Sequence, residues 1–141
     1  MDHELSRLEV GNLREAVVSA VRPIVSVVDD DESLRESLPG LLRELGFDAE
    51  AFSSAEEFLA SDHLGRTQCL ILDVRMPGMT GPELLRELAR RGSRAPIIFI
   101  TAHADDAVRR GVLAQGAVAC LFKPFTAAAL LEALRDGLGA W

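Results

Sequence analysis

Short apolar runs alternate along the chain with longer stretches in which leucines recur at helical spacing. The runs at residues 24–28 and 96–100 are rich in β-branched residues, which is typical of strands buried on both faces of a parallel sheet. Leucines three or four residues apart in the intervening stretches indicate amphipathic helices. We predict strands at residues 24–28, 47–52, 69–72, 96–100 and 117–122, each followed by a helix. This order predicts a doubly wound α/β fold with one mostly parallel sheet.

Residues that favour helix ends support this reading. Asp31 and Thr126 are suitable N-caps, and either Asp105 or Asp106 opens the fourth helix. Residues 54–57 (SAEE) read as a capping box. Pro39 is the one conflict, because a proline inside a helix removes a hydrogen bond and should kink or split it.

The first 22 residues form a separate segment in the pattern. Their apolar residues lie at roughly helical spacing up to Pro23, so the segment could be an extra helix or a loose tail. We therefore divide the chain into an N-terminal extension, 1–22, and a folded domain, 23–141. Residues 1–13 lack the apolar region of a signal peptide, and no apolar run approaches about 18 residues, so a cytoplasmic protein is expected.

The net charge excludes some classes of binding partner, and the cysteines offer no sign of a disulfide framework. The net charge is −7, which argues against direct binding of nucleic acid or of a membrane surface by this chain. Cys69 and Cys120 lie inside apolar runs and are expected to be buried free thiols.

Polar residues follow four of the predicted strands. They are Asp29 and Asp30 after the first strand, Asp73 after the third, Thr101 after the fourth and Lys123 after the fifth. Ligands of open parallel sheets bind beyond the carboxyl ends of the strands, so these groups should meet at one edge. Taken singly, each could be a helix cap, a turn residue or a surface charge.

Clustered carboxylates repel one another, and a divalent cation or an ammonium group would relieve that repulsion. Mg²⁺ prefers such oxygen ligands. Lys123 is the only lysine among 15 basic residues, which suggests a site that needs a compact point charge. An aspartate beside Mg²⁺ can attack phosphorus to give an aspartyl phosphate.

Four motifs, taken together, resemble the response-regulator receiver domain. They are residues 27–32 (VVDDDE), 72–81 (LDVRMPGMTG), 99–102 (FITA) and 122–125 (FKPF), and their order and spacing match the family from about residue 24 to 138. The RMPGM stretch most resembles receivers of the FixJ-like type.

The resemblance implies a flavodoxin-like (βα)5 fold with sheet order 2-1-3-4-5. It implies that Asp73 accepts a phosphoryl group from a sensor histidine kinase or phosphotransfer protein. Asp29 and Asp30 resemble the family's acidic pair, and Asp30, Asp73 and the backbone carbonyl of Arg75 would bind Mg²⁺. Thr101 and Lys123 resemble the residues that contact the phosphoryl group, and Pro124 could follow a cis bond. Kinase docking would use Leu34, Leu38 and Phe125.

Cys120 departs from the family pattern, because many relatives have an aromatic switch residue there. Several alternatives stay open. The chain could act alone, through an unknown downstream protein or as a phosphate relay or sink, could form a phosphorylation-dependent dimer, or could be the receiver part of a DNA-binding transcription regulator. A phosphatase or phosphotransferase of the haloacid-dehalogenase type would need a second Asp where Arg75 stands. A receiver-like scaffold that is never phosphorylated is a further alternative.

Overall fold

The protein is built around one five-stranded parallel sheet. The computed structural model describes residues 22–139. The strands are β1 (Ile24–Val28), β2 (Asp48–Phe52), β3 (Cys69–Asp73), β4 (Ile97–Thr101) and β5 (Ala119–Phe122), in the spatial order β2-β1-β3-β4-β5. This confirms the predicted fold and sheet order. The strand that follows β1 in the chain, β2, lies on one side of it, and all later strands lie on the other side. The boundary between β1 and β3 is therefore the topological switch point of the sheet.

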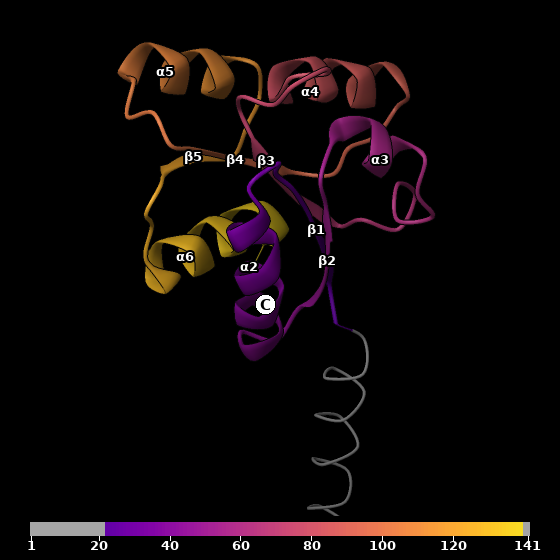
Figure 1. Ribbon diagram of the computed structural model, residues 1–141, viewed down its shortest axis with the longest axis vertical. Coiled ribbons are helices and arrows are strands. Elements are labelled where there is room, and N and C mark those ends of the chain that lie inside the picture. Colours follow the sequence, from indigo (N-terminus) through magenta and orange to yellow (C-terminus); the bar gives the residue numbers. More distant parts are fainter. Residues whose placement is uncertain (1–21, 140–141) are drawn as a thin grey trace, which may run out of the picture.

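In the part of the chain that the structure describes, five helices cover the two faces of the sheet. They are α2 (Glu32–Glu44), α3 (Ala55–Leu59), α4 (Gly81–Arg90), α5 (Asp106–Ala114) and α6 (Ala127–Leu138). Figure 1 shows α3, α4 and α5 on one face and α2 and α6 on the other. Because all strands are parallel, each of these helices lies in a crossover that returns the chain to the same end of the sheet.

The core consists of two apolar clusters separated by the sheet. Leu70, Leu72 and Phe99 face the cluster under α3, α4 and α5, whereas Cys69 and Ile71 face the cluster under α2 and α6. All five residues of β3 are buried, which explains why its sequence is a continuous apolar run. Both cysteines are buried free thiols, as predicted, and burial raises the pKa of Cys69 to about 12.

The helix ends mostly follow the predicted capping residues. Asp31, Ser54, Asp105 and Thr126 each accept a hydrogen bond from the backbone of the first turn. In the predicted capping box at residues 54–57, the Glu57 N–H donates to the Ser54 hydroxyl as expected. The Glu57 carboxylate does not complete the box, because it accepts a hydrogen bond from the Ser53 hydroxyl instead. A complete capping box, which the sequence analysis overlooked, joins residues 80 and 83 at α4.

Helix α2 continues through Pro39, so of the two predicted outcomes, a kink or a split, the split does not occur. Pro39 is buried, which allows its packing to offset the backbone hydrogen bond that a proline cannot donate.

The predicted N-terminal extension lies outside the described residues apart from Arg22, and the division at residue 23 stays a prediction. Within residues 22–139, no helix is long and apolar enough to cross a membrane.

Candidate functional site

Three carboxylates meet at the switch point of the sheet. Asp29 and Asp30 follow β1, and Asp73 is the last residue of β3, its neighbour in the sheet. One carboxylate oxygen from each of the three lies within 4.8 Å of the others. Asp29 is fully buried and Asp73 is 7% exposed, whereas Asp30 is exposed. The three aspartates that follow or end β1 and β3 thus lie together, as their places at the strand ends predicted.

Four hydrogen bonds among the described residues hold the carboxylate and the backbone of Asp29 in place. Its Oδ1 accepts a hydrogen bond from the Asp31 N–H at 2.9 Å, and its Oδ2 accepts one from Lys123 Nζ at 2.6 Å. Its backbone N–H donates to the Phe52 carbonyl, and its own carbonyl accepts a hydrogen bond from Arg35 Nη1 at 3.0 Å. Asp29 thus forms a rigid, buried side of the cluster.

Asp73 carries the main electrostatic perturbation of the site. Burial, followed by repulsion from the nearby Asp29 carboxylate, raises the pKa of Asp73 to about 7. Attraction to Lys123 and a hydrogen bond from the Arg75 backbone N–H act in the opposite direction on this pKa. The single ammonium group therefore does not fully balance the negative charge gathered here.

Lys123 and Thr101 lie at the adjoining strand ends. The Lys123 side chain is 16% exposed and forms an ion pair with Asp29. Its backbone N–H donates to the Thr101 carbonyl at 2.8 Å. Thr101 is 1% exposed, and its hydroxyl oxygen accepts a hydrogen bond from the His103 N–H. The bond between Lys123 and Pro124 is cis, as the sequence analysis anticipated.

The donor chemistry of the cluster fits Mg²⁺. Three carboxylates supply hard oxygen ligands close enough to share one ion, and the raised pKa of Asp73 is the mark of a site that gains from added positive charge. Arg75 lies two residues after Asp73 in the β3–α4 loop, its side chain is exposed, and its backbone N–H donates a hydrogen bond to Asp73.

Other residues shape the site without having been predicted to. Arg35 holds the carbonyl of Asp29. Gly81 begins α4 against the backbone of Asp73, where a Cβ atom would overlap the Asp73 carbonyl oxygen. Glu56 reaches from α3 to the β3–α4 loop. The sequence gives little signal for these contacts, because each depends on how separate elements pack.

A groove beside the acidic cluster brings together the residues predicted for kinase docking. Leu34, Leu38 and Phe125 line a cavity of about 820 Å³ between α2 and the β5–α6 loop, with Asp31 and Lys123 at its edge. An apolar surface thus continues directly into the charged site.

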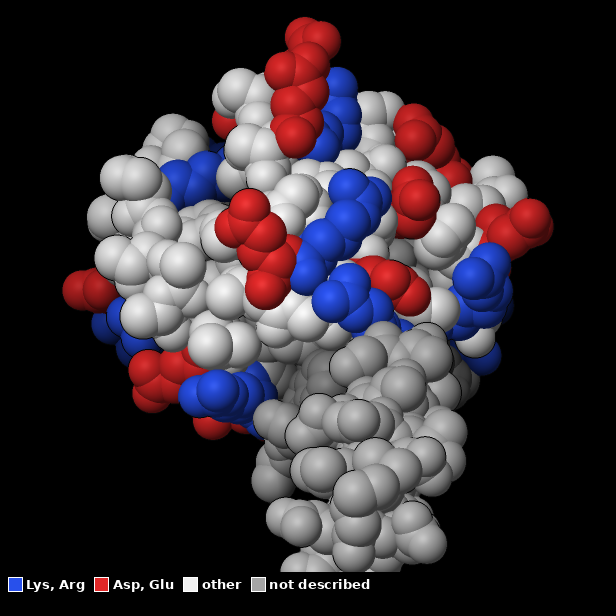
Figure 2. All heavy atoms as spheres, turned by 90° about the horizontal axis from the view of Figure 1, so that it is seen from below, with Lys and Arg blue, Asp and Glu red and all other residues white. Residues whose placement is uncertain are grey.

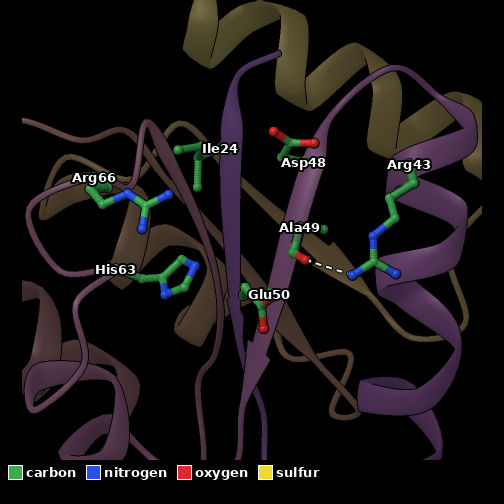
Figure 3. Close-up of a pocket in the computed structure, with 7 residues that line it drawn as sticks. All are labelled: Ile24, Arg43, Asp48, Ala49, Glu50, His63 and Arg66. Atoms are coloured by element: carbon green, nitrogen blue, oxygen red, sulfur yellow. Dashed lines mark hydrogen bonds between the residues drawn. The ribbon is translucent and has the colours of Figure 1, made fainter. Parts of the chain in front are cut away.

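A smaller hollow of about 230 Å³ lies at the opposite end of the sheet, where β1 and β2 begin. Figure 3 shows His63 and Arg66 to one side of these strands and Arg43 to the other, with Arg43 bound to the Ala49 carbonyl of β2. Acidic residues share the lining with these basic ones. On the face seen from below in Figure 2, blue and red side chains are likewise interspersed.

Comparison with known proteins agrees with this geometry. The response regulator receiver domain family matches residues 25–135. Nodulation protein W of Bradyrhizobium diazoefficiens is 45% identical over 116 residues, covering 82% of this chain and 51% of that protein. The transcriptional regulatory protein FixJ of Azorhizobium caulinodans is 41% identical over 115 residues, covering 82% and 54%. The solved structure of response regulator StyR superposes with a TM-score of 0.76 at 46% identity, covering 84% of this chain and 60% of that one.

The chain therefore belongs to the response regulator receiver domain family. The resemblance to FixJ-like receivers is confirmed by the relatives that carry that name. The chain spans about half the length of the curated relatives it matches.

Proposed function

We propose that this receiver accepts a phosphoryl group on Asp73 and thereby switches binding to a partner protein. The observation that carries the proposal is the meeting of three carboxylates and Lys123 at the switch point of the sheet. Family membership supports a histidine kinase or phosphotransfer protein as the donor. A cytoplasmic location fits such a partner and stays a prediction.

In this proposal each residue has a distinct task. An oxygen of the Asp73 carboxylate forms a bond to phosphorus while the bond from phosphorus to the donor histidine nitrogen breaks, and the imidazole leaves with its electron pair. Asp30, Asp73 and the Arg75 carbonyl would hold Mg²⁺, which supplies charge neutralisation for the transferred group. Asp29 completes the acidic pair and orients Lys123.

Thr101 and Lys123 would read the new phosphoryl group. The Thr101 hydroxyl can donate a hydrogen bond to it, and the Lys123 ammonium can approach one of its oxygens. In the structure Lys123 pairs with Asp29, so phosphorylation would give this lysine a second anionic partner. In this proposal, the change of partner by one charged side chain is the physical origin of the switch.

The test is incubation with Mg²⁺ and acetyl phosphate, followed by intact-protein mass spectrometry. We expect a gain of about 80 Da, one phosphoryl group per chain, that is absent from Asp73→Asn and from protein treated with a chelator. An adduct of the same yield in Asp73→Asn would contradict the assignment. An absence of adduct in the wild type with a set of small donors and with phosphorylated kinase would contradict the proposed function.

A transcriptional output is the second candidate, because relatives at about 40% identity are named transcriptional regulators and the match covers only about half of their length. Phosphorylation would then act on a partner or further domain that binds DNA. A phosphatase or phosphotransferase enzyme would instead show many turnovers of a phosphate ester per chain, whereas we expect no turnover beyond the loss of its own phosphoryl group.

A further inference from the structure

The loop between β3 and α4, residues 74–80, connects the proposed phosphoacceptor to the helix that follows it. Its two ends are tied to the framework. The Val74 N–H donates to the Ile100 carbonyl of β4, and the Gly81 N–H donates to the Val74 carbonyl, both at 3.1 Å. Between these ends lies Arg75, whose carbonyl is the predicted backbone ligand of Mg²⁺ and whose N–H contacts Asp73. The shape of the loop therefore bears directly on the site.

The middle of this loop is held by a side chain from another helix. The Met79 N–H donates to Oε2 of Glu56 in α3 at 3.1 Å, across 23 positions of sequence. The same oxygen lies over Gly78, where a Cβ atom would come within 2.7 Å of it. Gly78 has φ +74°, a conformation that favours glycine. The Glu56 carboxylate thus sits against the turn of the loop.

The structure offers no comparable role for the next acidic residue. Glu57 lies in the same first turn of α3 and carries the same charge, but its carboxylate accepts a hydrogen bond from Ser53, beside its own helix. Both glutamates are exposed. Glu56 and Glu57 thus match in charge, exposure and position but differ in the contact with the loop, so Glu57 serves as the control for substitutions of Glu56.

We propose that Glu56 is a positioning residue for the chemistry at Asp73. By accepting the Met79 hydrogen bond it holds the loop in the conformation that presents the Arg75 carbonyl to Mg²⁺. This inference rests on the proposed function. It assigns Glu56 no contact with metal or phosphate, and it makes the exposed N-terminal end of α3 part of the support of the site.

The first measurement needs neither metal nor phosphate. Amide hydrogen exchange of metal-free protein should show faster exchange at Met79 in Glu56→Ala than in the wild type. Glu56→Gln should stay close to wild type, because an amide oxygen can accept the same hydrogen bond. Glu57→Ala should leave Met79 unchanged. Since Glu56→Ala and Glu56→Gln lose the same charge, their difference isolates the hydrogen bond from the charge.

The second measurement is the Mg²⁺ dissociation constant by titration calorimetry, together with the rate of phosphorylation by acetyl phosphate at subsaturating and at saturating Mg²⁺. Losing one ordering hydrogen bond should weaken Mg²⁺ binding about 2- to 10-fold in Glu56→Ala. The rate should fall at subsaturating Mg²⁺ and largely recover at saturation. Glu56→Gln and Glu57→Ala should bind Mg²⁺ as the wild type does.

Faster exchange and weaker Mg²⁺ binding in Glu56→Ala alone would support the proposal. Equal exchange at Met79 in all variants would overturn it, and so would faster exchange with an unchanged Mg²⁺ dissociation constant. Equal weakening in Glu56→Ala and Glu56→Gln would also overturn it, by pointing to charge. If the wild type bound no Mg²⁺, the proposed function and the positioning role would both fail, and the exchange data would still report the contact on its own.

Discussion

At the scale of single residues, Asp73 makes its own contribution to the stability of the metal-free protein depend on pH. Its pKa is about 7 in the folded protein and about 4 in an unfolded chain. The folded state therefore keeps its proton at pH values where the unfolded state has lost it. As pH rises from about 4 to 7, the free energy of unfolding contributed by this residue falls, and above pH 7 the full penalty is present.

Asp73→Asn should remove this penalty. We expect a gain in the free energy of unfolding on the order of 1–3 kcal/mol at pH 8 without Mg²⁺, and a much smaller gain at pH 4.5. Urea unfolding in a chelating buffer at the two pH values measures it. Asp62→Asn, a change at an exposed loop residue, is the control and should be nearly neutral at both. A gain in Asp73→Asn that did not depend on pH would show that the carboxylate charge is not its cause.

Lys123→Arg should impair the switch although it keeps the charge. The Lys123 ammonium fits between β5 and Asp29 with 16% of its side chain exposed, at 2.6 Å from the carboxylate. A planar guanidinium is bulkier and presents its donors in a fixed fork, so it cannot take this position and then turn to a phosphoryl oxygen. We expect the variant to gain the 80 Da adduct while its amide NMR spectrum changes far less on phosphorylation than that of the wild type. Changes as large as those of the wild type would refute this use of the lysine.

The residues of the site were predictable where topology alone places them and not where side-chain packing does. Strand ends brought Asp29, Asp30 and Asp73 together as expected. The pairing of Lys123 with Asp29 could not be derived from the pattern, because any of the three carboxylates of the cluster was an equal candidate. The contact of Glu56 with Met79 depends on the path of one flexible side chain between two elements.

At the scale of elements, two glycines in helices should respond in opposite ways to the same substitution. Gly81 is buried at the first residue of α4, where a Cβ atom would overlap the Asp73 carbonyl oxygen and lie 2.8 Å from Phe99 Cε1. Gly40 is exposed inside α2, and a Cβ atom there would meet nothing within 4 Å. The close approach of α4 to Asp73 thus requires glycine at residue 81. At residue 40 no neighbour requires glycine, and the residue only lowers the helix propensity of α2.

Gly81→Ala should therefore lower the free energy of unfolding by on the order of 2–4 kcal/mol, because backbone on both sides must move. Gly40→Ala should raise it by about 0.5–1 kcal/mol. Chemical denaturation of the two variants beside the wild type gives both values. A neutral Gly81→Ala would mean that α4 can shift away from β3 without cost.

Strands and helices were predictable from periodicity because the central strands β1, β3 and β4 are continuous buried runs, whereas the edge strand β2 alternates between exposed and buried residues and each helix buries one face. The ends were less so. The first predicted residues of the second, fourth and fifth strands lie outside them in the structure, since apolar residues also occur where the chain enters the sheet. Local chemistry located the caps at Asp31 and Thr126, whereas the proline in α2 does not divide the helix, and the pattern did not reveal that Pro39 is buried.

At the scale of the whole molecule, the acidic cluster couples metal binding to global stability. A ligand that binds only the folded state raises the free energy of unfolding by an amount set by its concentration relative to its dissociation constant. The cluster is formed by residues from two strands, β1 and β3, so unfolding destroys it. If Mg²⁺ binds here, it should stabilise the entire domain rather than one loop.

We expect Mg²⁺ at about 10 to 30 times its dissociation constant to add on the order of 1–2 kcal/mol to the free energy of unfolding at pH 8. The gain should shrink at pH 5.5, because the ion must then displace a proton from Asp73, whose pKa is about 7. Asp30→Asn should reduce the gain at both pH values while changing the metal-free stability little, since Asp30 is exposed. Thermal unfolding with and without Mg²⁺, at matched ionic strength, measures all of these. An equal gain in the wild type and Asp30→Asn would place the binding of Mg²⁺ elsewhere on the acidic surface, and a gain that grew toward low pH would exclude Asp73 as a ligand.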